Sequence, residues 1–338
     1  MEKKIKNPIR VVQMGLGPIG NQATRYLAER PGIEIVGAVD VDPAKVGQDV
    51  GTLAGIPAVG VKVTDSLDEA LGGHRADAVL LTTVSSLAKA QAQLKSLLPY
   101  GVNVISSCEE LSYPWLTNPR VAEEIDALAR AHNVSVLSTG VNPGFLMDFL
   151  PVVMSGVCRN ITKITVERIQ DATFRRVPFQ KKIGAGLSLA EFEAKAKEGV
   201  LRHVGLTESI HMIAARLGWK LDATRDDLTP IIAERRIQTE GIIVEAGCAA
   251  GVQQIGVGIA GGKEVIRMVF RAAIGESGVR DRIIIDGTPG IDTCISGGLN
   301  GDVATCAILI NAIPVVVNAR PGLRTMADIE PISWFAGI

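Results

Sequence analysis

A glycine-rich turn followed by an acidic residue is the feature that most constrains the fold of this chain. The segment GLGPIG at 15–20 comes directly after the apolar run 9–14, and Asp40 follows a second apolar run at 33–39. A strand, a glycine turn, a helix, a second strand and an acid, in this order, form the fingerprint of a dinucleotide-binding unit. The pattern predicts a parallel βαβ unit with a cofactor at its first turn.

The residues of this turn have separate tasks. Gly15 permits a tight turn, Gly17 lets the backbone approach a pyrophosphate, and Gly20 allows the helix to lie close to the strand. The helix that follows offers unpaired N–H groups to the phosphates. Pro18 and Ile19 complete the predicted binding segment.

The acid after the second strand bears on which cofactor is used. Asp40 falls twenty residues after Gly20, where a carboxylate can accept hydrogen bonds from both ribose hydroxyls. A 2′-phosphate would face this carboxylate, so we expect NAD first. Lys45 can pair with such a phosphate, which leaves NADP open as a second cofactor. The alternative is a glycine turn in an α/β domain that binds nothing.

The first part of the chain alternates strands with helices. Short apolar runs at 76–83, 103–107 and 134–138 alternate with helical patterns at 85–98 and 119–132. This alternation predicts a doubly wound parallel sheet, in which ligands collect at the carboxyl ends of the strands.

From about residue 161 the pattern changes to strands with one polar face. The run 161–169 alternates polar and apolar residues, as a half-exposed strand does. Further strands are expected at 235–246, 265–273 and 282–286, and helices at 188–198, 208–217 and 302–313.

These patterns predict an α/β protein of three parts. Residues 1–150 are expected to form a Rossmann domain with a doubly wound parallel sheet. Residues 151–300 are expected to form an α+β domain with an open sheet, for substrate binding and dimerisation. Residues 301–338 are expected to form a C-terminal helix and tail that return to the first domain.

Composition excludes several function classes. The 35 Lys and Arg residues are balanced by 36 Asp and Glu residues, and no basic stretch follows a nucleic-acid backbone. The longest apolar stretch, 304–317, is interrupted by Asn311 and Pro314 and is too short to cross a membrane. Five scattered cysteines without a CxxC pair indicate reduced thiols in the cytoplasm, and four histidines without ligand spacing argue against a metal.

Two adjacent acids are the candidates for proton transfer. Glu109 and Glu110 follow the predicted strand 103–107, where a carboxylate would lie near the nicotinamide ring. Glu109 is closer to the strand end and is preferred as the catalytic residue. The alternatives are two solvated loop carboxylates, or a carboxylate that caps a following turn.

Polar residues after two other strands are further candidates. Thr82 and Thr83 end the run 76–83, and Asn142 lies before Pro143 in a loop after 134–138. Because a residue before proline is biased to an extended backbone, the Asn142 amide has a fixed direction and can hold the carboxamide of nicotinamide. The alternative is an ordinary turn that links two domains.

Basic residues near the start of the second domain suit an anionic substrate group. Arg168 and Arg175, with neighbouring cations up to Lys182, can anchor a substrate carboxylate, although a solvated face is the plainer interpretation. His203 lies eight residues before His211 on a possible helix and is kept as a substrate-site candidate.

Six segments together carry a resemblance to a known family. They are GLGPIG, VDVDPAKVGQDVG, SSCEELSYPW, STGVNPGFLMDFLP, KKIGAGLSLAEF and NAIPVVVNARPGL. The chain resembles the family of 2,4-diaminopentanoate dehydrogenase and the related native amine dehydrogenases, within a superfamily that includes dihydrodipicolinate reductase. The His-His, Lys and Asp-Ala-Pro-Ser-Gly-Thr signature of that reductase is missing, which argues against the lysine-pathway reaction.

The resemblance implies a homodimer that performs reversible, NAD(P)-dependent oxidative deamination of an amine to a ketone and ammonia. It carries the family's catalytic glutamate onto the Glu109–Glu110 pair, and we assign that role to Glu109 and a substrate contact to Glu110. Phe145, Met147 and Phe174 suit the apolar pocket of a simple amine, whereas Arg168 or Arg175 suits a diamino acid.

Three other functions are compatible with the same residues. Two are enzymes on the same fold, a cyclic imine reductase and a homoserine-type alcohol dehydrogenase. The third is a non-catalytic NAD-sensing subunit, in which Glu109 would be dispensable.

Overall fold

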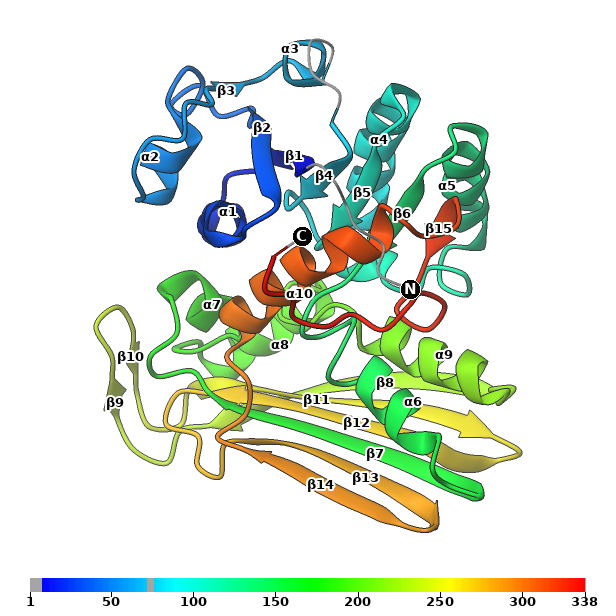
Figure 1. Ribbon diagram of the computed structural model, residues 1–338. Helices are drawn as coiled ribbons and strands as arrows, with labels where there is room; N and C mark the ends of the chain where they lie inside the picture. The colour runs from blue at the N-terminus through cyan, green and yellow to red at the C-terminus, as the bar shows by residue number, and fades with distance from the viewer. Residues whose placement is uncertain (1–7, 72–75, 338) are drawn as a thin grey trace. The chain divides into compact units, whose positions relative to one another are not determined.

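The computed structural model describes residues 8–71 and 76–337. The chain divides into two compact units, drawn together in Figure 1. Unit 1 contains the residues up to Phe145 and those from Asn300 onward, and unit 2 is Leu146–Leu299. The chain therefore leaves unit 1 shortly before residue 150 and returns to it at Asn300.

Unit 1 is built on a seven-stranded sheet in which every strand pair is parallel. Its order is β15-β6-β5-β4-β1-β2-β3. The strands are β1 (Ile9–Met14), β2 (Ile33–Val39), β3 (Val63–Thr64), β4 (Ala78–Leu81), β5 (Asn103–Ser106), β6 (Ser135–Ser138) and β15 (Gly322–Arg324).

The helices of unit 1 follow the strands, as a doubly wound sheet requires. They are α1 (Pro18–Glu29), α2 (Val50–Ala54), α3 (Leu67–Leu71), α4 (Leu87–Leu97), α5 (Pro119–Ala131) and α10 (Gly301–Val316), with short 3₁₀ turns η1 (Leu98–Tyr100) and η2 (Glu109–Leu111). Because β1 lies between β2 and β4, the chain turns to opposite sides of the sheet after β1, which creates the ligand crevice of such folds.

The core of unit 1 joins the sheet to its helices. Val79 on β4 and Val104 on β5 are fully buried with Leu94 of α4 and Ile125 of α5. The C-terminal helix α10 packs against α1 and β5 and buries Leu309. The expected return of the C-terminal helix is thus built into unit 1.

Unit 2 is built on a six-stranded mixed sheet with the order β14-β13-β7-β12-β11-β8. Only the β7–β12 pair is parallel among its described strands. The strands are β7 (Asn160–Asp171), β8 (Ala223–Ile232), β11 (Ala249–Ala260), β12 (Lys263–Ala273), β13 (Arg280–Thr288) and β14 (Ile291–Ser296).

Unit 2 also contains helices. They are α6 (Phe149–Ser155), α7 (Val177–Lys182), α8 (Leu189–Lys197) and α9 (Leu206–Leu217). Helix α9 packs on β8, β11 and β12, and α6 packs on β7 and β13. Along β7, the side chains of Ile164, Val166 and Arg168 are buried while the intervening Thr165 and Glu167 are half-buried, so the two faces of the sheet differ.

The predicted fold class is confirmed, with differences in unit 2. The single strand expected at 235–246 is a small two-stranded hairpin of β9 (Ile237–Gln238) and β10 (Ile243–Val244). Strands β8, β11 and β14 were not expected from the sequence pattern. Among the described residues no helix is long and apolar enough to cross a bilayer.

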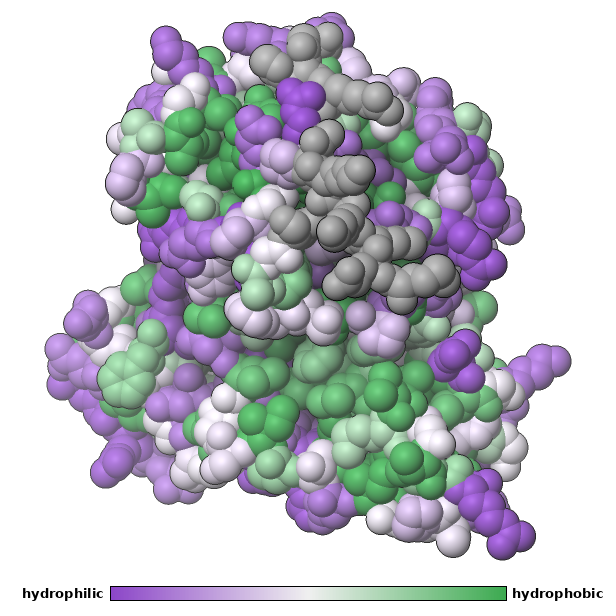
Figure 2. Space-filling view, in the orientation of Figure 1, coloured by the Kyte–Doolittle hydropathy of each residue, from purple (hydrophilic) through white to green (hydrophobic). Residues whose placement is uncertain are grey.

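An apolar surface lies on α6. Val153 on α6 and Val157 just after it are 52% and 72% exposed. Figure 2 shows green, apolar residues gathered in the area where Figure 1 draws α6.

Candidate cofactor and catalytic site

The glycine turn after β1 has the geometry that its sequence predicts. Gly15 has a positive φ of +90°, which a side chain would strain. A Cβ on Gly15 would lie 2.8 Å from the carbonyl oxygen of Thr82, and one on Gly20 would lie 1.8 Å from the carbonyl oxygen of Gly15. Both positions therefore exclude side chains because the strand, the turn and the helix approach closely.

Gly17 differs from the other two glycines because it faces open space. A Cβ there would meet nothing within 4 Å. Gly17 is the N-cap of α1, has an extended backbone, and makes no side-chain cap, with Pro18 next. Among the described residues, the first N–H groups of α1 thus have no side-chain acceptor, and the position suits an anionic group.

Two buried side chains hold the glycine turn by hydrogen bonds. Gln13, on β1, donates from Nε2 to Thr82 Oγ1 at 2.8 Å and to the Gly15 carbonyl at 3.0 Å. Thr82 Oγ1 in turn donates to the Gly15 carbonyl at 2.9 Å. Because Gln13 and Thr82 are 0% and 9% exposed, they hold the peptide of Gly15 in one orientation. Thr82 supports the turn, and Gln13 was not identified from the sequence.

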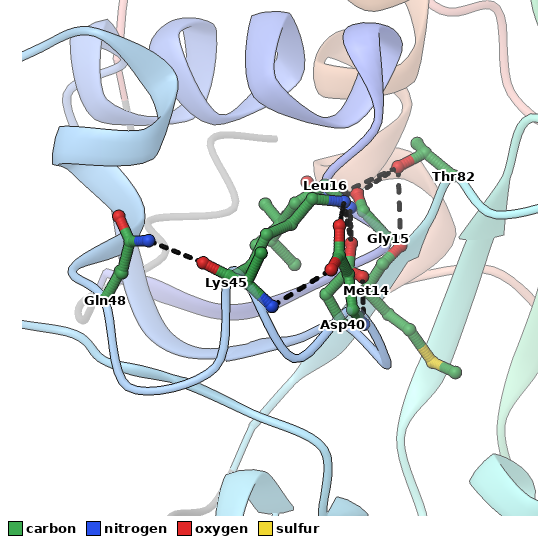
Figure 3. A network of polar contacts seen from close by, with 10 residues as sticks. Met14, Gly15, Leu16, Asp40, Lys45, Gln48 and Thr82 are labelled. Carbon is green, nitrogen blue, oxygen red and sulfur yellow. Dashed lines mark hydrogen bonds and ion pairs between the residues drawn. The ribbon is translucent and has the colours of Figure 1, made fainter.

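Asp40 links the turn to the loop after β2, as Figure 3 shows. Its Oδ2 accepts from the Leu16 N–H at 2.7 Å and pairs with Lys45 Nζ at 3.0 Å, and its Oδ1 accepts from the Asp42 N–H at 2.9 Å. These donors occupy three of the roughly four acceptor positions of a carboxylate. A ribose hydroxyl there would use the remaining position or displace Lys45.

The charge of Asp40 is stabilised by these contacts. Burial raises the pKa of Asp40, but hydrogen bonds from the Asp42 and Leu16 N–H groups and the contact with Lys45 outweigh it, and the net pKa is lowered. Asp40 is therefore ionised at neutral pH. Lys45 lies beside it, where the sequence placed a partner for a 2′-phosphate.

The two candidate acids after β5 differ in their contacts. Glu110 Oε2 accepts from the Leu87 N–H at 2.7 Å, at the first residue of α4. Glu109 is half-buried, and its carboxylate has no hydrogen bond or ion pair with any residue in the described ranges. Glu110 therefore binds the start of a helix that precedes it in the sequence, rather than capping a following turn. The expected contact of Glu110 with the substrate stays a prediction, and Oε2 is the oxygen already bound to α4.

The neighbouring loops carry the other unit 1 candidates. Thr83 Oγ1 donates to Gln93 Oε1 at 2.6 Å. Asn142 is 8% exposed, in a loop whose Val141 N–H donates to Thr305 Oγ1 of α10 at 3.2 Å. Phe145 is half-buried at the end of the same loop. Thr305 had no motif that could have identified it.

The Arg168 side chain forms an ion pair with Asp281 within unit 2. Its guanidinium is 2% exposed and pairs with both carboxylate oxygens of Asp281 at 2.8 and 2.9 Å. It also donates to the Leu299 carbonyl at 3.0 Å, while the Leu299 N–H donates to Asp281 at 2.7 Å. A buried guanidinium matched in this way is a structural ion pair, which corrects the expectation that Arg168 anchors a substrate.

The other unit 2 candidates have mixed environments. Arg175 lies with its guanidinium carbon 4.2 Å from the centroid of the Phe179 ring. Phe174 is 93% exposed, whereas Met147 is fully buried. His203 packs on the ring of Phe270 with centroids 4.4 Å apart.

The charge state of His203 follows from its surroundings. Burial, followed by the charges of Lys182 and Arg168, lowers the pKa of His203 to about 3. His203 is therefore neutral at neutral pH. Within the described ranges no three His, Cys, Asp or Glu side chains are grouped as metal ligands.

Comparison with known proteins identifies the family. The model of the 2,4-diaminopentanoate dehydrogenase C-terminal domain matches residues 145–336, and that of the dihydrodipicolinate reductase N-terminus matches residues 9–108. A 2,4-diaminopentanoate dehydrogenase of Acetoanaerobium sticklandii is 35% identical over 329 residues, which cover 95% of this chain and 93% of that protein. The chain belongs to the 2,4-diaminopentanoate dehydrogenase family.

More distant relatives agree with this family. An amine dehydrogenase of Streptomyces virginiae is 25% identical to this chain, and the match covers 95% of this chain and 96% of that protein. The solved structure of an amine dehydrogenase from Mycobacterium smegmatis has a TM-score of 0.87 and 24% identity, with 98% of each chain covered. That structure supports the same fold, and the resemblance found in the sequence is confirmed.

Proposed function

We propose that this chain is an NAD(P)-dependent amine dehydrogenase, which interconverts an amine with a ketone and ammonia. The observation that carries the proposal is the half-buried Glu109 carboxylate, which follows a strand of the parallel sheet and has no partner among the described residues. Ligands bind at this end of such strands. Membership of an amine-oxidising family supports the reaction class.

The residues around the glycine turn fit a dinucleotide. The open space at Gly17 and the uncapped start of α1 suit a pyrophosphate, and Asp40 with Lys45 suits the adenine ribose. Asn142 remains our candidate for the nicotinamide carboxamide. When bound, the nicotinamide ring supplies the hydride acceptor for the reaction.

Glu109 supplies the proton chemistry in this proposal. An ammonium does not release a hydride readily, so the Glu109 carboxylate first accepts a proton from the substrate nitrogen. Once this proton has passed to water, the restored Glu109 carboxylate stabilises the iminium ion that forms on the substrate. Glu109 then takes a proton from the attacking water and returns it to the nitrogen. Ammonia leaves, and Glu109 accepts the hydroxyl proton as the ketone forms. In the reverse direction these roles run backward and a ketone is reductively aminated.

The substrate we favour is 2,4-diaminopentanoate, with 2-amino-4-oxopentanoate as its ketone, or a simpler amine and ketone pair. Because the charge of Arg168 is already paired with Asp281, Arg175 is the stronger candidate for binding a substrate carboxylate. Phe145 and Phe174 are the apolar alternatives for a simple amine. His203, being neutral, does not repel a substrate ammonium.

The deciding experiment is oxidation of NADH with concentrated ammonia, comparing 2-amino-4-oxopentanoate with 2-pentanone. A strong preference for the amino-keto acid supports the diaminopentanoate reaction, and activity mainly on 2-pentanone supports a broad amine dehydrogenase. Activity without ammonia would favour an alcohol dehydrogenase. NADH binding without turnover on either ketone would favour a cyclic imine reductase or a sensor.

A variant tests the role of Glu109. Glu109→Gln keeps the size of the side chain but removes the base, so kcat should fall at least about a hundredfold. The Kd for NADH, measured by fluorescence titration, should not change. Near-normal turnover in this variant removes Glu109 from the mechanism.

Cofactor choice depends on Asp40 and Lys45. We propose that NAD is preferred because the ionised Asp40 repels a 2′-phosphate, and that Lys45 permits some use of NADP. Asp40→Ala should raise kcat/KM with NADP relative to NAD by about tenfold, since removing one charge contact changes binding by about 1.4 kcal/mol. An unchanged ratio contradicts this assignment.

We also propose a cytoplasmic homodimer. None of the five cysteines, all within the described residues, is in a disulfide, which suits a reducing compartment. The half-buried face of the unit 2 sheet, with Thr165 and Glu167, is the surface we favour for the partner copy. Light scattering should give about twice the 35.7 kDa mass of the chain.

A further inference from the structure

The segment that carries Glu109 is fixed by hydrogen bonds at successive residues. The Cys108 N–H donates to Ser106 Oγ at 3.1 Å, and the Cys108 carbonyl accepts from Ser138 Oγ at 2.6 Å. The Glu109 carbonyl accepts from Ser112 Oγ at 2.8 Å. Three serine hydroxyls thus hold the backbone on both sides of η2.

Glu110 connects this segment to the start of α4. Its Oε2 accepts from the Leu87 N–H at 2.7 Å, and its own N–H donates to the Ser85 carbonyl at 3.3 Å. Cys108 Sγ donates to the same carbonyl at 3.2 Å. Ser86, the N-cap of α4, makes no side-chain cap of its own. A carboxylate from another part of the chain therefore accepts from the first N–H of α4 and lies at the positive end of this helix.

We propose that Glu110 is a positioning residue for Glu109, which deepens and rests on the proposed function. Successive side chains of a 3₁₀ turn point about 120° apart. With Glu110 bound to the Leu87 N–H of α4, the orientation of η2 is fixed, and with it the position of the adjacent Glu109. Glu110 exchanges no proton with the substrate; it fixes the direction from which Glu109 accepts one.

The first test compares two variants of Glu110. Glu110→Ala removes the acceptor, so kcat should fall about ten- to a hundredfold, because small misplacements of a reacting group have effects of this size. Glu110→Gln retains an acceptor oxygen and should keep kcat within about threefold, because the N–H contact persists. The Kd for NADH should not change in either variant. Parent-like kcat in Glu110→Ala, or Glu110→Gln as slow as Glu110→Ala, overturns the proposal.

The pH profile of kcat adds a measurement that a loss of protein stability alone would not change. The dependence of kcat on pH should keep its acidic limb in Glu110→Gln, because Glu109, the proposed base, is unchanged in this variant. Loss of that limb in Glu110→Gln would make Glu110 the base and overturn the proposal. Activity retained in Glu109→Gln would instead remove the proposed function itself, whatever the Glu110 variants do.

A second pair of variants removes the donor rather than the acceptor. Leu87→Pro and Leu87→Ala both lose the buried leucine side chain, but only proline lacks the N–H. Proline is tolerated at the first residue of a helix, and Ser86 already has the extended backbone (φ −83°, ψ 127°) that precedes proline.

The donor variants also guard against misfolding of Glu110→Ala. Leu87→Pro should be slower than Leu87→Ala by the factor that Glu110→Ala loses, and adding Glu110→Ala to Leu87→Pro should cause no further loss. Equal kcat in Leu87→Pro and Leu87→Ala contradicts the proposal.

Discussion

Gln13 is a polar side chain in the middle of an apolar strand, and its hydrogen bonds explain its presence there. It supports the Gly15 peptide directly and through Thr82. Together these contacts fix the turn before any cofactor binds, so less ordering is needed on binding.

We expect Gln13→Met to weaken NADH binding about five- to tenfold, because a net hydrogen bond contributes about 0.5–1.5 kcal/mol. Fluorescence titration with NADH measures this Kd. The control is Gln48→Met, since Gln48 donates to the Ala44 carbonyl on the surface. Equal Kd values for the parent and the Gln13 variant contradict the expectation.

His203 links stability to pH through its neutral state. The folded pKa of about 3 lies below the ordinary 6.5, so the unfolded chain binds a proton that the folded chain does not. Stability contributed by neutral His203 is complete above pH 6.5 and decreases as the pH falls toward 3. At pH 5 the loss is about 2 kcal/mol.

Urea unfolding at pH 7 and pH 5 measures this dependence. The parent should lose more stability between the two values than His203→Gln, which has no group that titrates at this position. The same loss in both proteins would show that other groups determine the pH dependence.

At the residue scale, the sequence identified the glycine turn, Asp40 and the pair of acids, because their spacing along the chain carries the signal. It preferred Glu109 over Glu110 from position alone, because the contact that distinguishes the two acids comes from Leu87, 23 positions away. It also misassigned Arg168, whose partner Asp281 lies 113 positions further on. Pairings of this kind depend on the folded sheet.

Among the elements, β11 has an unusual composition for a central strand. Gly251, Gly256 and Gly258 lie within it, and glycine is normally depleted in strands. A Cβ on Gly256 or Gly258 would lie 2.9 Å from Ile210 of α9. The glycines therefore let α9 lie close to the sheet.

These glycines should differ in their tolerance of alanine. A Cβ on Gly251 would lie 2.0 Å from the Ala272 carbonyl oxygen, which is backbone, whereas Gly256 faces the flexible end of Ile210. Gly251→Ala should destabilise by about 3 kcal/mol or more and Gly256→Ala by about 1 kcal/mol. Thermal unfolding compares the two, and a larger effect at Gly256 would be the opposite of what this packing requires.

Physical features of β8 and β11 explain why the sequence pattern did not predict these strands. In β11 the glycines weaken the apolar signal, and β8 carries charged residues and Pro230. Pro230 is tolerated because β8 is an edge strand. By contrast, the apolar residues of β1, β2 and β12 predicted strands whose bounds lie close to those in the structure.

At the scale of the whole molecule, the Arg168–Asp281 ion pair lies where the chain leaves unit 2. It clamps both the N–H and the carbonyl of Leu299, the last residue of unit 2. Asp281→Asn leaves a buried arginine without its counter-charge and should destabilise by about 3–5 kcal/mol.

The double variant Arg168→Met with Asp281→Leu removes both charges and should be less destabilised than Asp281→Asn, because no unpaired charge is buried. Thermal unfolding of the two variants and the parent makes the comparison. A double variant that is less stable than Asp281→Asn would contradict a predominantly electrostatic role.

The return of the chain at Asn300 has a consequence for how the protein is made. Unit 1 consists of two stretches of sequence, and α10 and β15 come last. During synthesis from the N-terminus, all of unit 2 leaves the ribosome before the final strand of the parallel sheet exists. The nucleotide-binding unit, although it begins first, is therefore the one whose folding must wait until α10 and β15 have been synthesised.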